Sequence, residues 1–193
     1  MNLPNKLSVL RMIMVPIFVV VMMLPFEPWS SIIGVALFII ASLTDMLDGK
    51  IARKYNLITD FGKFIDPLAD KFMVIGALLV ILYKYETIRP VFIWAVIIVI
   101  FRELAVTSIR LVASSSSGVV IAANWLGKIK TCTQIACVCA VIIEPIIYMI
   151  PGLEFMVQYL PLTYLTTALM VIFTLWSGIN YIVSYWKYLD PQK

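Results

Sequence analysis

The chain has no histidine and only three cysteines, and both shortages narrow its possible chemistry. Without histidine it lacks the usual general base near neutral pH and the usual imidazole ligand for a metal ion. Any acid–base step must therefore use a carboxylate, a lysine or a tyrosine. Cys132, Cys137 and Cys139 lie in one apolar run and match neither a metal-ligand spacing nor a disulfide framework. We interpret them as small residues that pack helices.

Charged residues are also scarce: they make up 13% of the 193 residues, whereas 62% are hydrophobic. An ordinary soluble domain is roughly 45–50% apolar and about 25% charged. A water-soluble fold of this length could not bury so much apolar surface. We therefore predict an all-α integral membrane protein that forms a single domain over residues 1–193.

Six apolar stretches are long enough to cross a bilayer, since a membrane helix needs about 20 mostly apolar residues. We expect these helices at about residues 8–26, 30–50, 62–84, 89–113, 124–150 and 158–187. Prolines and a run of serines at 114–117 separate them. No small-x-small cleavage site follows the first stretch, so we expect a retained membrane helix rather than a signal peptide.

Basic residues predict the orientation, because cytoplasmic loops are enriched in lysine and arginine. Six spans place both termini on one side, together with the loops at 51–61 and 114–123. That side holds eleven basic residues: Lys6, Arg11, Lys50, Arg53, Lys54, Lys63, Arg110, Lys128, Lys130, Lys187 and Lys193. The opposite side holds only Lys84 and Arg89. We therefore expect a multi-pass protein with both termini in the cytoplasm.

Four aspartates gather at the predicted cytoplasmic ends of the second and third spans. Asp45 and Asp48 are three residues apart, and Asp66 and Asp70 are four apart. On an α-helix these spacings leave the two members of a pair about 60° and about 40° apart, so each pair shares one face. A short loop joins the two helices, and we expect them to be antiparallel neighbours whose aspartate pairs face each other.

Such a cluster needs compensation, because four close carboxylates repel one another and charged aspartates within a membrane are costly. A hard divalent cation with oxygen ligands, Mg²⁺ or Mn²⁺, is the natural solution, and four acids could hold two ions about 4 Å apart. The alternative is a loop with ordinary solvated acids, which is how we interpret Asp60. Gly49, Ala52 and Gly62 could either pack helices closely or leave room for a ligand.

The pattern Asp45-x2-Asp48-Gly49-x2-Ala52-Arg53-x8-Gly62-x3-Asp66-x3-Asp70 resembles the signature of the CDP-alcohol phosphatidyltransferases at all eight positions. The resemblance implies a bundle of six transmembrane helices with its active site at the cytoplasmic edge of a bacterial membrane. It implies that Asp45, Asp48, Asp66 and Asp70 bind two metal ions and that Asp70 is also the catalytic base. The family also suggests a homodimer.

The resemblance further implies a donor site for CDP-diacylglycerol. Its members would be Asn5, Ser8, Gly49, Ala52, Arg53, Thr59 and Gly62. Asn5 and Ser8 belong to the opening Pro4-Asn5-Lys6-Leu7-Ser8-x2-Arg11, which resembles the family's entry helix less closely.

The acceptor is indicated by a second region. The segments 101–110 and 127–131 resemble family members that use glycerol 3-phosphate. Arg110, Lys128 and Lys130 would then bind its phosphate, or the two lysines could simply mark the inner side. Arg102 lies about two turns deeper than Arg110, and we interpret it and Glu103 as a structural ion pair.

The resemblance thus implies transfer of a phosphatidyl group from CDP-diacylglycerol to glycerol 3-phosphate, releasing CMP, by direct displacement. Alternative acceptors are inositol phosphate, serine or phosphatidylglycerol. A different alternative is a cation transporter, but its site should lie near the membrane midplane rather than at one edge. Membrane lipids are expected partners, and nucleic acids are not.

Overall fold

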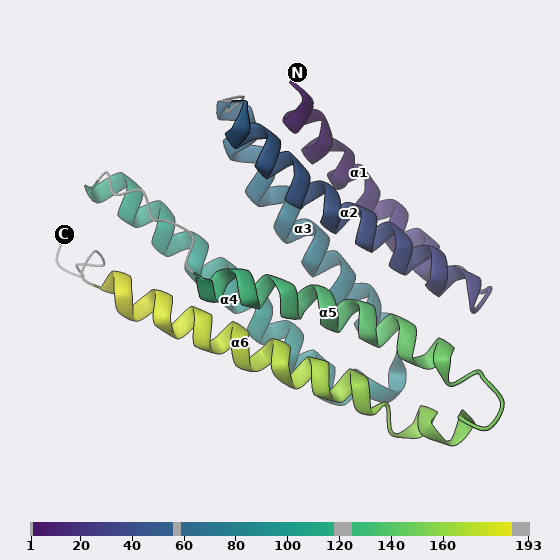
Figure 1. Ribbon diagram of the computed structural model, residues 1–193. Helices are drawn as coiled ribbons and strands as arrows, with labels where there is room; N and C mark the ends of the chain where they lie inside the picture. Colours follow the sequence, from purple (N-terminus) through teal and green to yellow (C-terminus); the bar gives the residue numbers. More distant parts are fainter. Residues whose placement is uncertain (1, 56–58, 118–124, 187–193) are drawn as a thin grey trace.

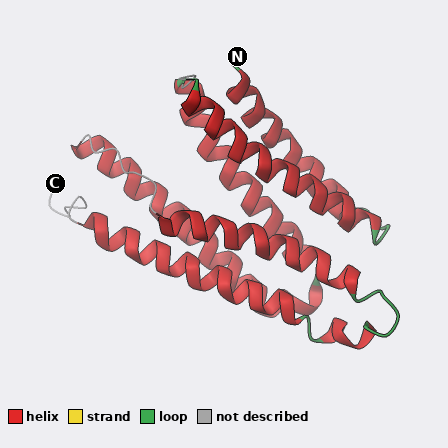
Figure 2. Cartoon of the chain, viewed as in Figure 1, coloured by secondary structure: helices red, strands yellow, loops and turns green. Residues whose placement is uncertain are grey.

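The computed structural model describes residues 2–55, 59–117 and 125–186, without the side chains of residues 48, 50–54, 63 and 113–117. Within these ranges there are six α-helices and no strand (Figure 2). The α-helices are α1 (Leu3–Met23), α2 (Trp29–Lys54), α3 (Asp60–Lys84), α4 (Arg89–Ser117), α5 (Trp125–Ile147) and α6 (Pro161–Tyr185). Two short 3₁₀ segments, η1 (Glu86–Ile88) and η2 (Glu154–Gln158), precede α4 and α6. The prediction of an all-α protein is confirmed.

Capping residues and prolines determine where the helices begin and end. The side chain of Asn2 accepts a hydrogen bond from the Asn5 amide (3.3 Å) at the start of α1, and Thr59 accepts one from the Gly62 amide (3.0 Å) at the start of α3. Both satisfy backbone donors that a helix N-terminus leaves unpaired. Helix α1 ends just before Pro25, as expected from the loss of a backbone donor at proline.

Five segments are long and apolar enough to cross a membrane: Leu3–Met23, Trp29–Leu47, Glu86–Val112, Trp125–Ile147 and Glu154–Tyr185. Their surfaces carry many exposed large hydrophobic side chains, which suit a lipid environment. The chain is therefore a multi-pass membrane protein. Helix α3 is not among the five, because Asp66, Asp70, Lys71 and Lys84 leave its apolar stretch interrupted by charge.

The helices form two groups of three (Figure 1). Helix α1 packs along both α2 and α3, and α6 packs along both α4 and α5. The groups meet where α2 and α3 contact α5 and where α3 contacts α4. The contact between α2 and α3 is much smaller than the contact that α1 makes with either of them. The expectation that α2 and α3 are close antiparallel neighbours is thus only partly right, because α1 contributes most of the surface that each of them packs on.

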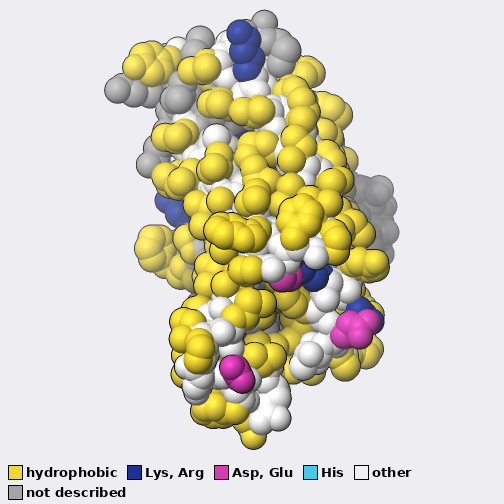
Figure 3. All heavy atoms as spheres, turned by 90° about the vertical axis from the view of Figure 1, so that its right-hand side faces the viewer, with side chains coloured by type: hydrophobic (Ala, Val, Ile, Leu, Met, Phe, Trp, Pro, Cys, Tyr) yellow, Lys and Arg dark blue, Asp and Glu magenta, His cyan; other side chains and the backbone are white. Residues whose placement is uncertain are grey.

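The connections alternate between the two ends of the bundle. The start of α1, the end of α2, the start of α3, the end of α4 and the end of α6 lie at one end (Figure 1). We call this the aspartate end, because the aspartate motif lies there. The α1–α2, α3–α4 and α5–α6 connections lie at the other end. Figure 3 views the molecule from that second end, where a few charged side chains are scattered over a mostly hydrophobic surface.

A polar network joins the α1–α2 connection to the end of α3, at the second end of the bundle. Lys84 forms an ion pair with Glu27 and donates hydrogen bonds to Ser30 and Ser31, each 3.2 Å long. Ser31 donates to Glu27 (2.9 Å) and lies 3.3 Å from the Tyr85 hydroxyl. Burial alone would raise the pKa of Glu27, but the hydrogen bonds from Lys84 and the serines outweigh it and hold this pKa below its ordinary value.

A carboxylate on α5 caps the start of α6. Glu144, which is 1% exposed, accepts hydrogen bonds from the amides of Leu162 (2.8 Å) and Thr163 (2.6 Å). The Tyr148 hydroxyl donates a third (2.8 Å). The first residue of α6 is Pro161, which has no amide hydrogen. The cap therefore satisfies the first backbone donors of α6 within the protein.

Candidate functional site

The first helix reaches two of the four motif aspartates. Arg11 on α1 forms an ion pair with Asp45 on α2, and the Ser8 hydroxyl donates a 2.5 Å hydrogen bond to Asp66 on α3. Asn5, Ser8 and Arg11 are three residues apart, so they share one face of α1, and all three are buried. Helix α1 thus connects the two halves of the aspartate motif.

The motif carboxylates offer only oxygen donors, which is the ligand chemistry of Mg²⁺ and Mn²⁺. Among the described side chains, no group of three carboxylate or thiolate residues lies close enough together to hold a metal ion. Asp48 is one of the side chains outside that description. Asp45 already binds a cation, the Arg11 guanidinium, and Asp70 lies in the electrostatic field of both Asp45 and Arg11. The donor set therefore fits a divalent cation in its chemistry.

Three of the predicted donor-site residues lie together at the start of α3. Asn5 donates a 2.9 Å hydrogen bond from its amide nitrogen to the Thr59 hydroxyl, which also accepts from the Gly62 amide. A side-chain carbon at Gly62 would lie 2.8 Å from the Asn5 oxygen and 3.2 Å from the Thr59 hydroxyl. A larger residue at position 62 would therefore push these two groups apart.

The remaining donor-site residues are only partly described. Ser8 lies next to this group through its bond to Asp66, and Gly49 is half-buried on α2. The side chains of Ala52 and Arg53 lie outside the described residues, so their part in the donor site stays a prediction.

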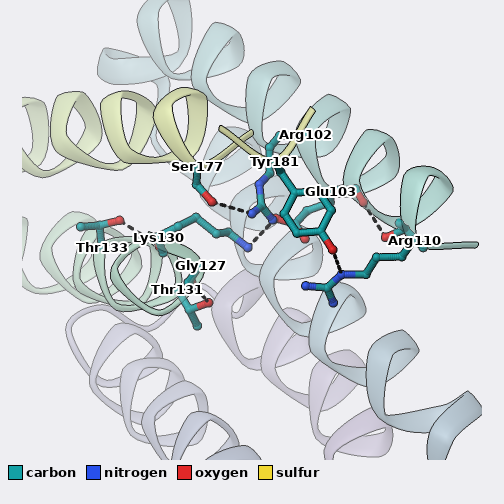
Figure 4. Close-up of polar contacts among 10 residues, drawn as sticks. Arg102, Glu103, Arg110, Gly127, Lys130, Thr131, Thr133, Ser177 and Tyr181 are labelled. Carbon is teal, nitrogen blue, oxygen red and sulfur yellow. Dashed lines mark hydrogen bonds and ion pairs between the residues drawn. The ribbon is translucent and has the colours of Figure 1, made fainter. Parts of the chain in front are cut away.

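A buried ionic cluster, made of Arg102, Glu103, Lys130 and Ser177, joins α4, α5 and α6 (Figure 4). Glu103 forms ion pairs with Lys130 and with Arg102, the latter at 3.2 Å. Arg102 also donates a 2.8 Å hydrogen bond to Ser177. The predicted Arg102–Glu103 ion pair is confirmed. The cluster carries two cations and one carboxylate, so its net charge is positive in a buried setting, where charge is costly unless compensated.

Arg110 extends this positive region toward the end of α4. Its Nε donates a 2.8 Å hydrogen bond to the Tyr181 hydroxyl on α6, and its guanidinium lies over the Tyr181 ring, 5.3 Å from the centroid. Tyr181 is 4% exposed, whereas Arg110 is exposed. A buried tyrosine thus holds an exposed arginine through a hydrogen bond and a ring contact (Figure 4).

The two lysines assigned to the acceptor site differ in their surroundings. Lys130 is buried against Glu103, whereas Lys128 is exposed. Residues two apart on a helix do not face the same way, so the structure does not bring Lys128 together with Lys130. The charges of Lys130 and Glu103 do act on Asp70, which places the ionic cluster within electrostatic range of the aspartate motif.

Five residues of this region were not assigned to the site from the sequence: Arg11, Arg102, Glu103, Ser177 and Tyr181. Arg11 carried a usable signal, because a charged residue continues the polar stripe of Asn5 and Ser8 at a spacing of three. Glu103 was recognised only as the neighbour of Arg102. Ser177 and Tyr181 are far from α4 in the sequence, and their spacing alone indicates no contact with it.

Comparison with known proteins identifies the family. The sequence profile of the CDP-alcohol phosphatidyltransferases matches residues 1–184. A Bacillus subtilis protein named CDP-diacylglycerol–glycerol-3-phosphate 3-phosphatidyltransferase is 43% identical, covering 99% of this chain and 98% of its own. Proteins of the same name from Salmonella paratyphi A (32% identical; 94% and 93% covered) and Yersinia enterocolitica (30% identical; 99% of both) are also similar. With an eight-position motif and a profile match over nearly its whole length, the chain belongs to the CDP-alcohol phosphatidyltransferase family.

Proposed function

We propose that the protein transfers the phosphatidyl group from CDP-diacylglycerol to glycerol 3-phosphate, giving phosphatidylglycerol phosphate and CMP. The names of relatives that match over nearly the whole chain support this reaction. The structural observation that supports glycerol 3-phosphate as the acceptor is the net positive cluster of Arg102, Glu103 and Lys130, with Arg110 nearby on α4. A phosphate dianion is the ligand that such a cluster would bind.

The proposed topology has six spans, with α3 crossing as well, and a single domain over the whole chain. The aspartate end would face the cytoplasm. Support comes from the start of α1, the end of α2, the start of α3 and the end of α6, which lie at the same end of the bundle (Figure 1), and from the basic residues on that side. The apolar part of α3 that follows Lys71 contributes Met73, Val74, Ala77 and Leu78 to the buried core. The charged part of α3 would then lie at the membrane edge. We also propose that the protein forms a homodimer.

The proposed metal site consists of Asp45, Asp48, Asp66 and Asp70, which would hold two Mg²⁺ or Mn²⁺ ions. When bound, these ions would neutralise the phosphate charges and polarise the phosphorus that is attacked. The oxygen-only donor set supports this assignment. So does the repulsion between the Asp45 and Asp70 charges, which a bound cation would relieve.

In the proposed mechanism each substrate has its own residues. Asn5, Ser8, Gly49, Ala52, Arg53, Thr59 and Gly62 would contact the CDP group. Arg53 would hold the pyrophosphate. Arg110 and Lys130 would hold the phosphate of glycerol 3-phosphate, with the exposed Lys128 attracting the anion from solution.

The proposed base is Asp70, which would accept the proton of the attacking glycerol hydroxyl. The oxygen would then attack the phosphate that carries diacylglycerol, in line with departing CMP. Asp70 is half-buried on α3 and within the field of Lys130. A base in this position would act between the proposed metal site and the proposed acceptor cluster.

The decisive experiment measures CMP release by the purified protein in lipid nanodiscs with CDP-diacylglycerol and one acceptor at a time. Glycerol 3-phosphate should be the best acceptor among glycerol 3-phosphate, glycerol, inositol phosphate, serine and phosphatidylglycerol. Faster release with inositol phosphate or serine would leave the family intact and overturn the acceptor assignment. No release with any acceptor would overturn the proposed reaction.

A further inference from the structure

Arg11 is a fully buried cation in the first membrane helix. It is 0% exposed, and its guanidinium is ion-paired with Asp45, whose side chain is 37% exposed. A buried arginine is costly unless it is paired and hydrogen-bonded. The protein therefore keeps the permanent positive charge of Arg11 next to the Asp45 carboxylate. In the proposed function, that same carboxylate binds a divalent metal ion.

The carboxylate on the neighbouring helix is treated differently. Asp66 accepts a hydrogen bond from the neutral hydroxyl of Ser8, on the same face of α1. A hydroxyl can orient a carboxylate that also binds a metal ion, because a carboxylate has about four lone-pair sites and the hydroxyl brings no charge. A guanidinium brings a full charge to Asp45, so it repels an incoming cation as well as competing for the oxygen.

We propose that Arg11 is a built-in counter-ion that neutralises Asp45 while the metal site is empty and releases this carboxylate when a divalent cation binds. The proposal rests on the metal site of the proposed function. Arg11 is then a positioning residue, because it acts through Asp45. The presence of Arg11 weakens metal binding and stabilises the metal-free protein. A purely structural ion pair would stabilise the protein without weakening metal binding.

The test compares Arg11→Gln with the parent protein, with Arg11→Lys and with Arg102→Gln as controls. Arg102→Gln removes a second intramembrane arginine that is paired with a carboxylate, Glu103, outside the aspartate motif. Mn²⁺ binding to the purified proteins in nanodiscs is measured from the electron paramagnetic resonance signal of free Mn²⁺. Arg11→Gln should bind Mn²⁺ at least about tenfold more tightly than the parent, which is about 1.4 kcal/mol. Arg11→Lys keeps the charge and should stay close to the parent, as should Arg102→Gln.

Thermal unfolding gives an independent measurement. Without Mn²⁺, both Arg11→Gln and Arg102→Gln should unfold at lower temperature than the parent. With saturating Mn²⁺, the deficit of Arg11→Gln should largely disappear, because the metal ion replaces the missing charge. The deficit of Arg102→Gln should remain. An Arg11→Gln protein that folds only when prepared with Mn²⁺ would give the same support.

Three outcomes would overturn the proposal. One is that Arg11→Gln binds Mn²⁺ no more tightly than the parent, and another is that it is equally destabilised with and without the ion. The third is that it does not fold under either condition. If the parent binds Mn²⁺ and releases CMP in any of these cases, only the role of Arg11 fails. If the parent binds no Mn²⁺, the proposed metal site fails and the role of Arg11 fails with it.

Discussion

Replacing Arg110 by alanine should weaken the use of glycerol 3-phosphate far more than the use of CDP-diacylglycerol. A hydrogen bond to a charged group contributes about 1.5–3 kcal/mol. At 1.4 kcal/mol per factor of ten, losing the contact with the acceptor phosphate should raise its Michaelis constant roughly 10–150-fold. The Michaelis constant for CDP-diacylglycerol should change little, because Arg110 lies on α4, away from the residues assigned to the donor.

Tyr181→Phe provides a graded version of the same change. It removes the 2.8 Å hydrogen bond to Arg110 and keeps the aromatic ring beneath the guanidinium. Because Arg110 is exposed, losing this hydrogen bond should cost about 0.5–1.5 kcal/mol, or roughly a 2–12-fold rise in the Michaelis constant for glycerol 3-phosphate. In the Arg110→Ala background, Tyr181→Phe should have almost no further effect on this constant.

The assay measures CMP release while one substrate is varied and the other is saturating. Arg53→Ala is the matched control, since it should raise the Michaelis constant for CDP-diacylglycerol instead. If Arg110→Ala raised both Michaelis constants equally, Arg110 would have a structural role and not an acceptor role. A larger effect for Tyr181→Phe than for Arg110→Ala would also refute the reasoning, because a positioning residue cannot contribute more than the residue it positions.

Three further predictions concern the metal, the topology and the pH dependence. A chelator should abolish CMP release and Mg²⁺ or Mn²⁺ should restore it, while Asp66→Asn should be inactive with either ion; full activity in chelator would exclude a required metal. In a cysteine-free background, a cysteine at Lys6 should react with a membrane-impermeant reagent only from the cytoplasmic side and one at Glu86 only from the outside, and labelling of both from one side would contradict six spans. The pKa of Glu27 is held below its ordinary value of 4.5, so the charge of Glu27 stabilises the fold above pH 4.5, and this stabilisation is lost as the pH falls through the lowered pKa. The difference in unfolding temperature between the parent and Glu27→Gln should therefore shrink between pH 6 and pH 3. A constant difference would show that the charge of Glu27 is not involved.

The helices could be predicted closely because the length of an apolar stretch and the positions of prolines are local properties. The third helix was expected at 62–84 and is found at Asp60–Lys84, and the fifth was expected at 124–150 and is found at Trp125–Ile147. The short segments η1 and η2 were not predicted. They lie beside expected breaks, where sequence patterns indicate an end to a helix and not the conformation that follows it.

Helix packing was harder to predict than helix position. A short connection suggested that α2 and α3 are direct neighbours, but α1 packs on both, so that Arg11 and Ser8 reach Asp45 and Asp66. Likewise, nothing local in the sequence indicates that Glu103 binds Lys130, which is 27 positions later. Such pairs depend on how two helices are rotated against each other, and only the three-dimensional structure specifies that rotation.

The cap that Glu144 forms on α6 bears on the thickness of the bilayer in which the protein can work. A helix start with bare amides must stay near water, because an unpaired backbone donor costs several kcal/mol in hydrocarbon. The amides of Leu162 and Thr163 are already bonded to Glu144, and Pro161 has none to satisfy. The first amides of α6 therefore need neither water nor headgroups as partners. Where the hydrocarbon region is thicker than the helix is long, fewer unpaired backbone donors at this end would have to be satisfied.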